Sequence, residues 1–312
     1  MNPDSRPDTH RRHPRKRISA SISWLVTRQI AMAGSAVAIV FASAQYLEET
    51  ISLWWYVAAF FGTWCVYLRD SAASCRTEDA ISQPRRAAVF RDSERWCRVA
   101  PFASAIVALL AILLARPTAT TWIVMTTIGI LGLLHGFQNP PVRASEIRRP
   151  LASMAVIKSP IVAGAWTLGA VALPILESES GTAPSPISVI LVSVLLYLAL
   201  LCDSLLLDLR DRVADQTYGL HTIAVRIGSR GIHALVGLLI ALMVLTSLIG
   251  IVGLEQAASW RRLSIGCTLG IAVPWVLWQR LRKDEATVTL SMMAWRYIAA
   301  VAVVGSASMP AQ

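Results

Sequence analysis

Long runs of apolar residues, separated by short polar segments, recur along the whole 312-residue chain. As an α-helix, a run of roughly 17 to 25 apolar residues is long enough to cross a hydrocarbon core of about 30 Å. We therefore predict about nine transmembrane helices. Their predicted bounds are Trp24 to Tyr46, Ile51 to Leu68, Val99 to Ala115, Thr121 to Phe137, Leu151 to Leu176, Ile187 to Leu207, Ile232 to Leu254, Leu263 to Leu281 and Val288 to Val304.

The runs favour helices over strands, because they lack the alternation of apolar and polar residues that a membrane strand requires. Each helix also satisfies its own backbone hydrogen bonds, which a lipid environment demands. The composition agrees with this interpretation, since 55% of the residues are hydrophobic, only 15% are charged and the mean hydropathy is +0.54. A soluble globular chain of this length is excluded. We predict an all-α integral membrane protein.

The basic residues give the chain a formal net charge of +10, which by itself is compatible with nucleic-acid binding. Most of them, however, lie in the N-terminal segment and in the loops after the second, fourth, sixth and eighth runs. Basic loops stay on the cytoplasmic side of a membrane. We expect a multi-pass protein of the cell (inner) membrane, in contact with membrane lipid and with no nucleic-acid partner. Residues 1–22 form a basic, disordered cytoplasmic arm in this prediction, and residues 23–308 form a single membrane domain.

Three carboxylates stand at the end of the sixth apolar run, in the stretch DLRDRVADQTYGLHTIAVRIG at residues 208–228. If the helix continues, Asp208, Asp211 and Asp215 share a face only about 60° wide. Such a stripe repels itself unless a cation offsets it, and its oxygen atoms suit a hard ion such as Mg²⁺. The alternative is a solvated surface loop in which the acids pair with neighbouring arginines, namely Arg210, Arg212 and Arg226.

This stretch resembles the second aspartate motif of the UbiA superfamily of intramembrane prenyltransferases, DxRDxxxDxxxGxxTxxxxxG. The matching positions are Asp208, Arg210, Asp211, Asp215, Gly219, Thr222 and Gly228. The resemblance extends over roughly residues 24 to 305 and implies nine helices around a central cavity, with two aspartate-rich motifs on cytoplasmic loops. It also implies a Mg²⁺-dependent transferase that moves an isoprenoid group from a prenyl diphosphate to a hydrophobic or aromatic acceptor.

The first aspartate motif of the family, NDxxDxxxD leading into DxxNxPxRP, is only partly matched. In SAASCRTEDAISQPRRA, Asp79 aligns with the last aspartate, while Ala72 and Cys75 replace the other two. Some relatives instead have a YxxDRxxD form, which aligns Tyr67 and Asp70 but puts Ser74 at the second acid.

In either alignment an expected ligand is missing. Asp70 and Asp79 lie on opposite sides of a continuous helix, so they face one ion only if the segment bends, and Glu78 is a substitute ligand. The alternative is a set of interfacial salt bridges between these acids and Arg69, Arg76 and Arg85.

Two further segments resemble the family. HGFQNPPVR, which contains His135 and Asn139, is similar to the YSxPPxR segment that bounds the family pocket. Lys158 begins a stretch similar to KxxxVAxxW, and its ammonium is expected near the diphosphate, with snorkelling from a helix end as the alternative. The resemblance implies catalytic roles for Asp208, Asp211 and Asp215, metal binding by the same three acids and Asp79, and substrate binding by Tyr67, Asp70, Arg86, Asn139, Lys158 and Arg210.

The degenerate first motif leaves a second interpretation open. The chain then keeps the fold but serves as a catalytically impaired binding or regulatory membrane protein. A transporter built from paired repeats is disfavoured, because the apolar runs contain no chain of acids and no broken helices. The sequence does not specify the acceptor or the length of the prenyl chain.

Overall fold

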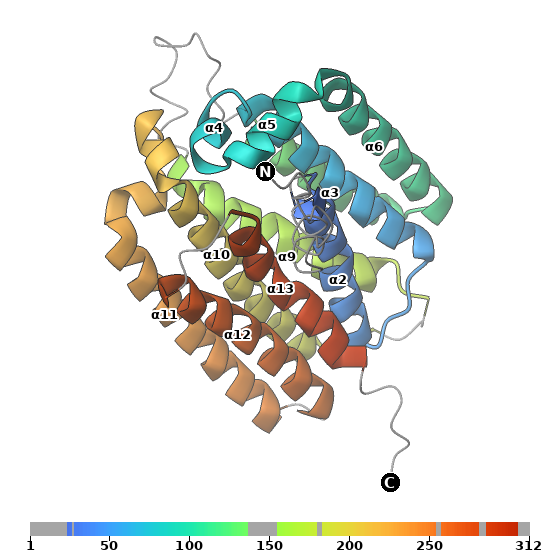
Figure 1. Cartoon of the computed structure of the whole chain (residues 1–312). Helices are drawn as coiled ribbons and strands as arrows, with labels where there is room; N and C mark the ends of the chain where they lie inside the picture. Colours follow the sequence, from blue (N-terminus) through green and yellow to red (C-terminus); the bar gives the residue numbers. More distant parts are fainter. Residues whose placement is uncertain are drawn as a thin grey trace, which may run out of the picture.

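The computed structural model describes residues 24–26, 28–136, 155–179, 183–253, 257–280 and 285–304. In these ranges each predicted apolar run corresponds to one long helix (Figure 1). The long helices are α2 (Ile30–Tyr46), α3 (Leu53–Ser74), α6 (Glu94–Ala115), α7 (Ala119–Gly136), α9 (Lys158–Leu176), α10 (Pro186–Thr217), α11 (Ile223–Gly253), α12 (Ala257–Arg280) and α13 (Glu285–Val304). The predicted basic arm at residues 1–22 lies outside the described residues.

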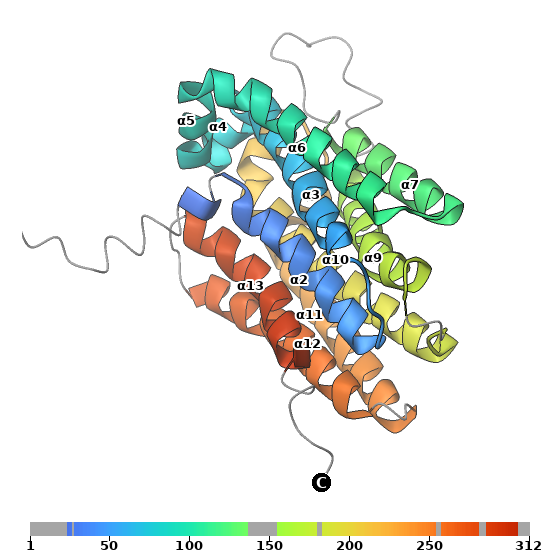
Figure 2. The same cartoon turned by 90° about the vertical axis from the view of Figure 1, so that its right-hand side faces the viewer.

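The long helices lie side by side, and their contacts form a closed ring (Figures 1 and 2). The helices α2, α3, α7, α9, α10, α11, α12 and α13 follow one another around this ring, and α13 returns to α2. Helix α6 packs against the outer side of α3. Helix α10 also contacts α12 and α13, and its Leu195 and Leu196 are fully buried.

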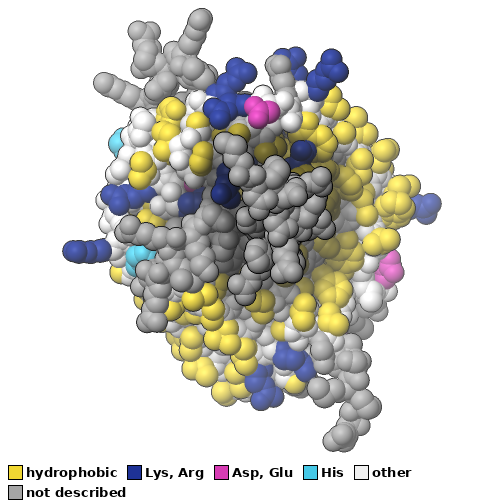
Figure 3. Space-filling view, viewed as in Figure 1, with side chains coloured by type: hydrophobic (Ala, Val, Ile, Leu, Met, Phe, Trp, Pro, Cys, Tyr) yellow, Lys and Arg dark blue, Asp and Glu magenta, His cyan; other side chains and the backbone are white. Residues whose placement is uncertain are grey.

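The outer surface of the bundle is apolar. Large hydrophobic side chains point outward, among them Phe102, Val252 and Val301, and Figure 3 shows hydrophobic side chains over wide areas of one face. Four described helical segments are long and apolar enough to cross a membrane, namely Arg95–Ala115, Ala155–Leu176, Pro186–Thr217 and Ile223–Gly253. Because a water-soluble monomer rarely exposes so much apolar surface, the chain is a membrane protein.

Several helices extend further than the hydrophobic pattern predicts, and two of these extensions, those of α10 and α3, shape the site. Helix α10 continues ten residues past the predicted end to Thr217, so the acidic stretch lies on the helix itself. Helix α3 continues to Ser74, and two short helices, α4 (Glu78–Ser82) and α5 (Pro84–Asp92), follow it at one end of the bundle (Figure 1). Apolar content marks the lipid-crossing part of a helix and not its polar continuation.

Two glycines of the acidic stretch occupy backbone conformations that other residues rarely adopt. Gly219 has φ +71° just after α10, where the Leu220 amide donates to the carbonyl of Asp215. Gly228 has φ 70° and ψ 178° and kinks α11. A residue with a Cβ atom is strained in both conformations. These glycines therefore turn the chain back from α10 into the next crossing.

Candidate substrate-binding site

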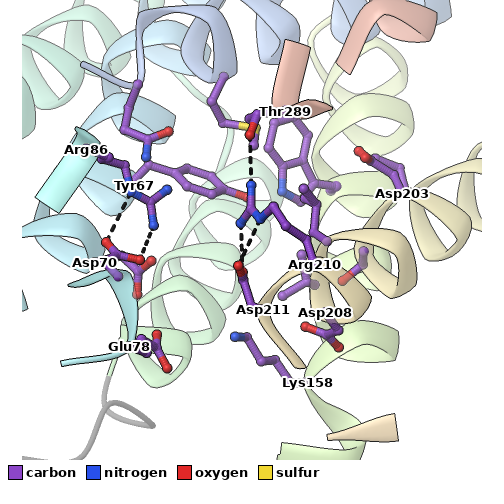
Figure 4. Close-up of a pocket in the computed structure, with 18 of the residues that line it drawn as sticks. Tyr67, Asp70, Glu78, Arg86, Lys158, Asp203, Asp208, Arg210, Asp211 and Thr289 are labelled. Carbon is purple, nitrogen blue, oxygen red and sulfur yellow. Dashed lines mark hydrogen bonds and ion pairs between the residues drawn. The ribbon is translucent and has the colours of Figure 1, made fainter. Parts of the chain in front are cut away.

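A polar pocket of about 90 Å³ lies beside α4 and α5, where α3 and α10 end and α9 begins (Figure 4). Its lining residues come from α2, α3, α4, α5, α9, α10 and α13. Six of the lining side chains are Asp or Glu and four are Lys or Arg, so the charges are close to balanced. A pocket of this kind suits a charged ligand, because the Lys and Arg side chains that line it can leave their carboxylate partners and bind the ligand instead.

The acids of α10 all have partners within the protein. Asp208 is buried and accepts a hydrogen bond from Ser159, at the start of α9. Asp211 accepts two hydrogen bonds from the guanidinium of Arg210, at 2.8 and 2.7 Å. Arg210 also donates to the Thr289 hydroxyl at 2.8 Å (Figure 4). This arrangement fixes the Arg210 guanidinium at the pocket between α10 and α13.

Asp215 lies one turn further along α10. It is buried and accepts a 3.0 Å hydrogen bond from Thr222, which precedes α11. It does not line the polar pocket, although it interacts electrostatically with Lys158. The hydrogen bond between Thr222 and Asp215 therefore links the end of α10 to the start of α11.

The segment after α3 bends, and the bend brings the acids of the first motif together. Asp70 near the end of α3 and Asp79 on α4 both line the pocket. At the bend, the Ser74 hydroxyl donates a 2.6 Å hydrogen bond to Asp79. Ser74 stands where the YxxDRxxD form has its second acid. In this chain a hydroxyl at that position donates a hydrogen bond to the carboxylate of Asp79.

Arg86 of α5 forms a two-point ion pair with Asp79. Its Nε donates to one carboxylate oxygen at 3.1 Å, and a terminal nitrogen donates to the other. Burial alone lowers the pKa of Arg86, but the charge and hydrogen bonds of Asp79 raise it above its ordinary value. Arg86 is therefore held as a cation at the rim of the pocket.

Lys158, the first residue of α9, points into the acidic part of the pocket. Figure 4 shows it between Glu78, Asp208 and Asp211. The strongest electrostatic partners of its ammonium are Asp208 and Glu78, followed by Asp70. Burial raises the pKa of Glu78 to about 8, although the charge of Lys158 opposes this shift. Lys158 therefore balances the negative charge of the pocket acids, Asp208 foremost.

A buried ion pair forms part of the pocket wall. Arg296 of α13 pairs with Asp203 of α10, and its guanidinium also donates to Ser35 at 2.9 Å. The Arg296 Cζ atom lies 4.1 Å from the centre of the Trp166 ring. Since the two charges offset each other, this part of the pocket carries little net charge.

Beyond this pair the lining becomes apolar. A second cavity of about 280 Å³, the apolar chamber, lies among α2, α3, α6, α7 and α9. Its lining residues are Ala, Val, Ile, Leu, Gly and Met, with Thr63 and two aromatic rings as exceptions. The polar pocket and the chamber share Tyr67, Val162 and Trp166, so the two cavities are neighbours with these side chains between them. The Tyr67 and Trp166 rings, with centres 6.3 Å apart, mark the boundary.

The structure brings most of the sequence-predicted site residues to one place. The pocket is lined by Tyr67, Asp70, Asp79, Arg86, Lys158, Asp208, Arg210 and Asp211. Asp215 lies beside the pocket, and Asn139 lies outside the described residues. Asp203 and Arg296 also line the pocket, and neither is among the residues predicted from the sequence. The sequence does carry a signal for them, namely a charged residue inside an apolar run, because such residues are costly in lipid unless they are paired.

The carboxylates, as arranged, do not fit a divalent cation. Asp79, Asp203 and Asp211 are each paired with an arginine, and Asp208 faces Lys158. Within the described part of the chain, no group of three or more His, Cys, Asp and Glu side chains is placed to hold a metal ion. The Mg²⁺ site at Asp79, Asp208, Asp211 and Asp215 therefore stays a prediction of the sequence.

The fold and the site define a class: a helical membrane protein in which a polar pocket lies next to an apolar chamber. Neither a protein-family model nor a curated protein sequence matches the chain. Among solved structures, the fold is similar to the apo structure of a UbiA homolog from Aeropyrum pernix K1, with a TM-score of 0.64. The match covers 89% of this chain and 98% of that chain at 13% sequence identity. The chain therefore has a UbiA-like fold, as the resemblance predicts.

Proposed function

We propose that the chain is an intramembrane prenyltransferase of the UbiA superfamily. It transfers an isoprenoid group from a prenyl diphosphate to an electron-rich, aromatic or otherwise hydrophobic acceptor. The observation that carries the proposal is that the polar pocket and the apolar chamber lie next to each other, with Tyr67, Val162 and Trp166 lining both. A prenyl diphosphate has the same two parts, an ionic head and an apolar tail. The UbiA-like fold and the acidic motif on α10 support the proposal.

The diphosphate head binds at the polar pocket in this proposal. Arg86, Lys158 and Arg210 supply positive charge there. In the free protein each of these cations is paired with or faces a carboxylate, so the diphosphate replaces the carboxylates as their partner when it binds. Charge-assisted hydrogen bonds from arginine and lysine to phosphate oxygens are strong and favour the departing diphosphate.

The reaction then begins at the boundary of the two cavities. The bond between the allylic carbon and the diphosphate oxygen breaks, and both electrons leave with the diphosphate. The resulting carbocation lies near the faces of Tyr67 and Trp166, and an aromatic face stabilises a cation. Electrons of the acceptor ring form the new carbon–carbon bond, and the displaced ring proton passes to an ionised carboxylate, for which we propose Asp211, which lines the pocket.

Exclusion of water is the second role of the apolar chamber. Water would capture the carbocation before the acceptor reacts, so a dry lining keeps the reaction productive. In the proposed orientation the polar pocket faces the cytoplasm of the cell, and the prenyl tail lies within the bilayer part of the bundle.

A second candidate function is a binding or regulatory role without prenyl transfer. It is favoured by the ion pairs that already neutralise the pocket acids and by Ala72 and Cys75 at aspartate positions of the first motif. In that case a prenyl diphosphate or another anionic lipid binds but does not react.

Release of pyrophosphate separates the two candidates. Purified protein in detergent receives geranyl, farnesyl or geranylgeranyl diphosphate with a panel of aromatic acceptors, with and without Mg²⁺. The transferase proposal expects acceptor-dependent release that Asp211→Asn lowers at least about a hundredfold. Asp92→Asn, a change at an exposed acid of α5, is the matched control and leaves release unchanged. Diphosphate binding without release under every condition supports the second candidate.

A further inference from the structure

We infer that the outer corner between α5 and α6 binds an anionic phospholipid, whose phosphate headgroup lies at a group of arginines and whose tails lie along the outer face of α6. The group, the arginine corner, consists of Arg85 and Arg91 on α5 and Arg95 and Arg98 on α6. All four side chains are exposed. This lipid site lies on the outside of the bundle, apart from the polar pocket, and it does not depend on the proposed function.

Positive charge dominates this part of the chain. Residues 84–98 contain five arginines and only two acids, Asp92 and Glu94. One of the five arginines, Arg86, turns inward and pairs with Asp79 in the polar pocket, so four remain on the surface. Figure 3 shows basic side chains gathered over α5 and the beginning of α6, next to a wide hydrophobic area. Such a surface attracts an anionic headgroup more strongly than a zwitterionic one.

The inner side of the corner is packed against the bundle. Ala87 and Phe90 of α5 are buried in one cluster with Leu68 of α3. The thiol of Cys97 on α6 donates a hydrogen bond to the Phe90 carbonyl, which joins the two helices. The arginines are therefore carried by a backbone that is already in place, and a headgroup does not have to order the segment when it binds.

The outer face of α6 matches the two parts of a phospholipid. Arg95, Arg98, Val99, Phe102 and Ile106 share a face about 100° wide. The two arginines stand at the start of a segment that is long and apolar enough to cross a membrane. The three apolar side chains that follow are 64%, 74% and 60% exposed. Cations at the membrane edge, followed by exposed hydrocarbon, suit a headgroup and the tails below it.

Arginine is suited to bind the phosphate group of such a lipid. Arg95 and Arg98 are three residues apart on a helix, so their side chains are neighbours and can reach one phosphate together. Each guanidinium can donate two parallel hydrogen bonds to phosphate oxygens. Phosphatidylglycerol keeps the negative charge of its phosphate, whereas the choline of phosphatidylcholine cancels it. The corner therefore favours the first lipid over the second.

Native mass spectrometry of the full chain, released from detergent, measures the affinity of the first lipid that binds. Dioleoyl phosphatidylglycerol is expected to bind at least about tenfold more tightly than dioleoyl phosphatidylcholine, since each basic residue near an anionic headgroup contributes about fivefold. Arg95→Gln/Arg98→Gln weakens the first phosphatidylglycerol affinity at least about tenfold and leaves phosphatidylcholine within about twofold. Arg95→Lys/Arg98→Lys keeps the charge and stays within about fivefold of the unaltered protein.

Two cations away from the corner provide the matched control. Arg116 lies at the other end of α6 and Arg261 lies on α12, and both are exposed. Arg116→Gln/Arg261→Gln removes the same charge but leaves the corner intact. The first phosphatidylglycerol affinity of this variant is expected to stay within about twofold of the unaltered protein.

Two results overturn the inference. One is an equal affinity of the unaltered protein for the two lipids, and the other is an equal loss in the corner variant and the control variant. Thermal unfolding in detergent checks that each variant folds. Arg85→Gln/Arg91→Gln is the second corner variant and carries the test if Arg95→Gln/Arg98→Gln does not fold. Neither result bears on binding of a prenyl diphosphate, so failure here is distinct from failure of the proposed function.

Discussion

Replacement of Lys158 by methionine tests the electrostatics of the polar pocket. The ammonium of Lys158 faces Asp208, Glu78 and Asp70 and also interacts with Asp215. Methionine keeps much of the length of the side chain and removes its charge. The pocket then has more uncompensated carboxylates, and an incoming diphosphate meets stronger repulsion.

The size of the effect follows from the lost interaction. A hydrogen bond to a charged group contributes about 1.5 to 3 kcal/mol, and a factor of ten in affinity is about 1.4 kcal/mol. Lys158→Met is therefore expected to weaken pyrophosphate binding about ten- to a hundredfold. Removal of the ammonium also frees the carboxylates to bind cations, so Mn²⁺ affinity rises in the same variant.

Titration calorimetry with inorganic pyrophosphate, in detergent and with EDTA, measures the first effect. Arg91→Met is the matched control, because Arg91 is an exposed cation of α5 that does not line the pocket. It changes the net charge equally and leaves affinity within about twofold. Equal affinity of Lys158→Met and the unaltered protein refutes the assigned role of Lys158.

Three further predictions concern stability, measured by thermal unfolding in detergent. Asp203→Asn and Arg296→Met each lower the free energy of unfolding by about 3 to 5 kcal/mol, because each leaves a buried charge unpaired. The double variant loses less than the sum of the two, and additive losses would contradict the pairing. Gly228→Ala costs about 1 to 3 kcal/mol because of its positive φ, and a neutral result argues against the kink. Gly250→Ala costs about 1 to 3 kcal/mol, since its Cβ atom would lie 2.1 Å from Trp260 Nε1. Gly253→Ala, with open space, is its control on the same helix and loses nothing.

The crossings were predictable from the sequence because lipid imposes a simple rule on each segment by itself. An apolar run of sufficient length becomes a helix, whatever its neighbours are. The position of the acids on one face of α10 followed from helical geometry in the same way. Asp208 and Asp211 line the pocket, whereas Asp215, one turn further along the helix, lies beside it.

The parts that were not predictable depend on contacts between distant segments. The bend after Ser74 brings Asp70 and Asp79 to one pocket, and after the bend α4 packs against α10, which is distant in the chain. The Asp203–Arg296 pair joins residues 93 positions apart in the chain. The hydrophobic pattern also ended α10 at Leu207, because it does not detect a helix that continues with polar residues.

The central claim is that the polar pocket and the apolar chamber together bind one prenyl diphosphate. The most direct measurement is a cryo-electron microscopy map of the protein with geranyl thiolodiphosphate, an analogue whose carbon–sulfur bond resists cleavage. The account predicts diphosphate density within hydrogen-bonding distance of Arg86, Lys158 and Arg210, and tail density that passes Trp166 into the chamber. Analogue density on the lipid-facing surface, with the chamber empty at a saturating concentration, would contradict it.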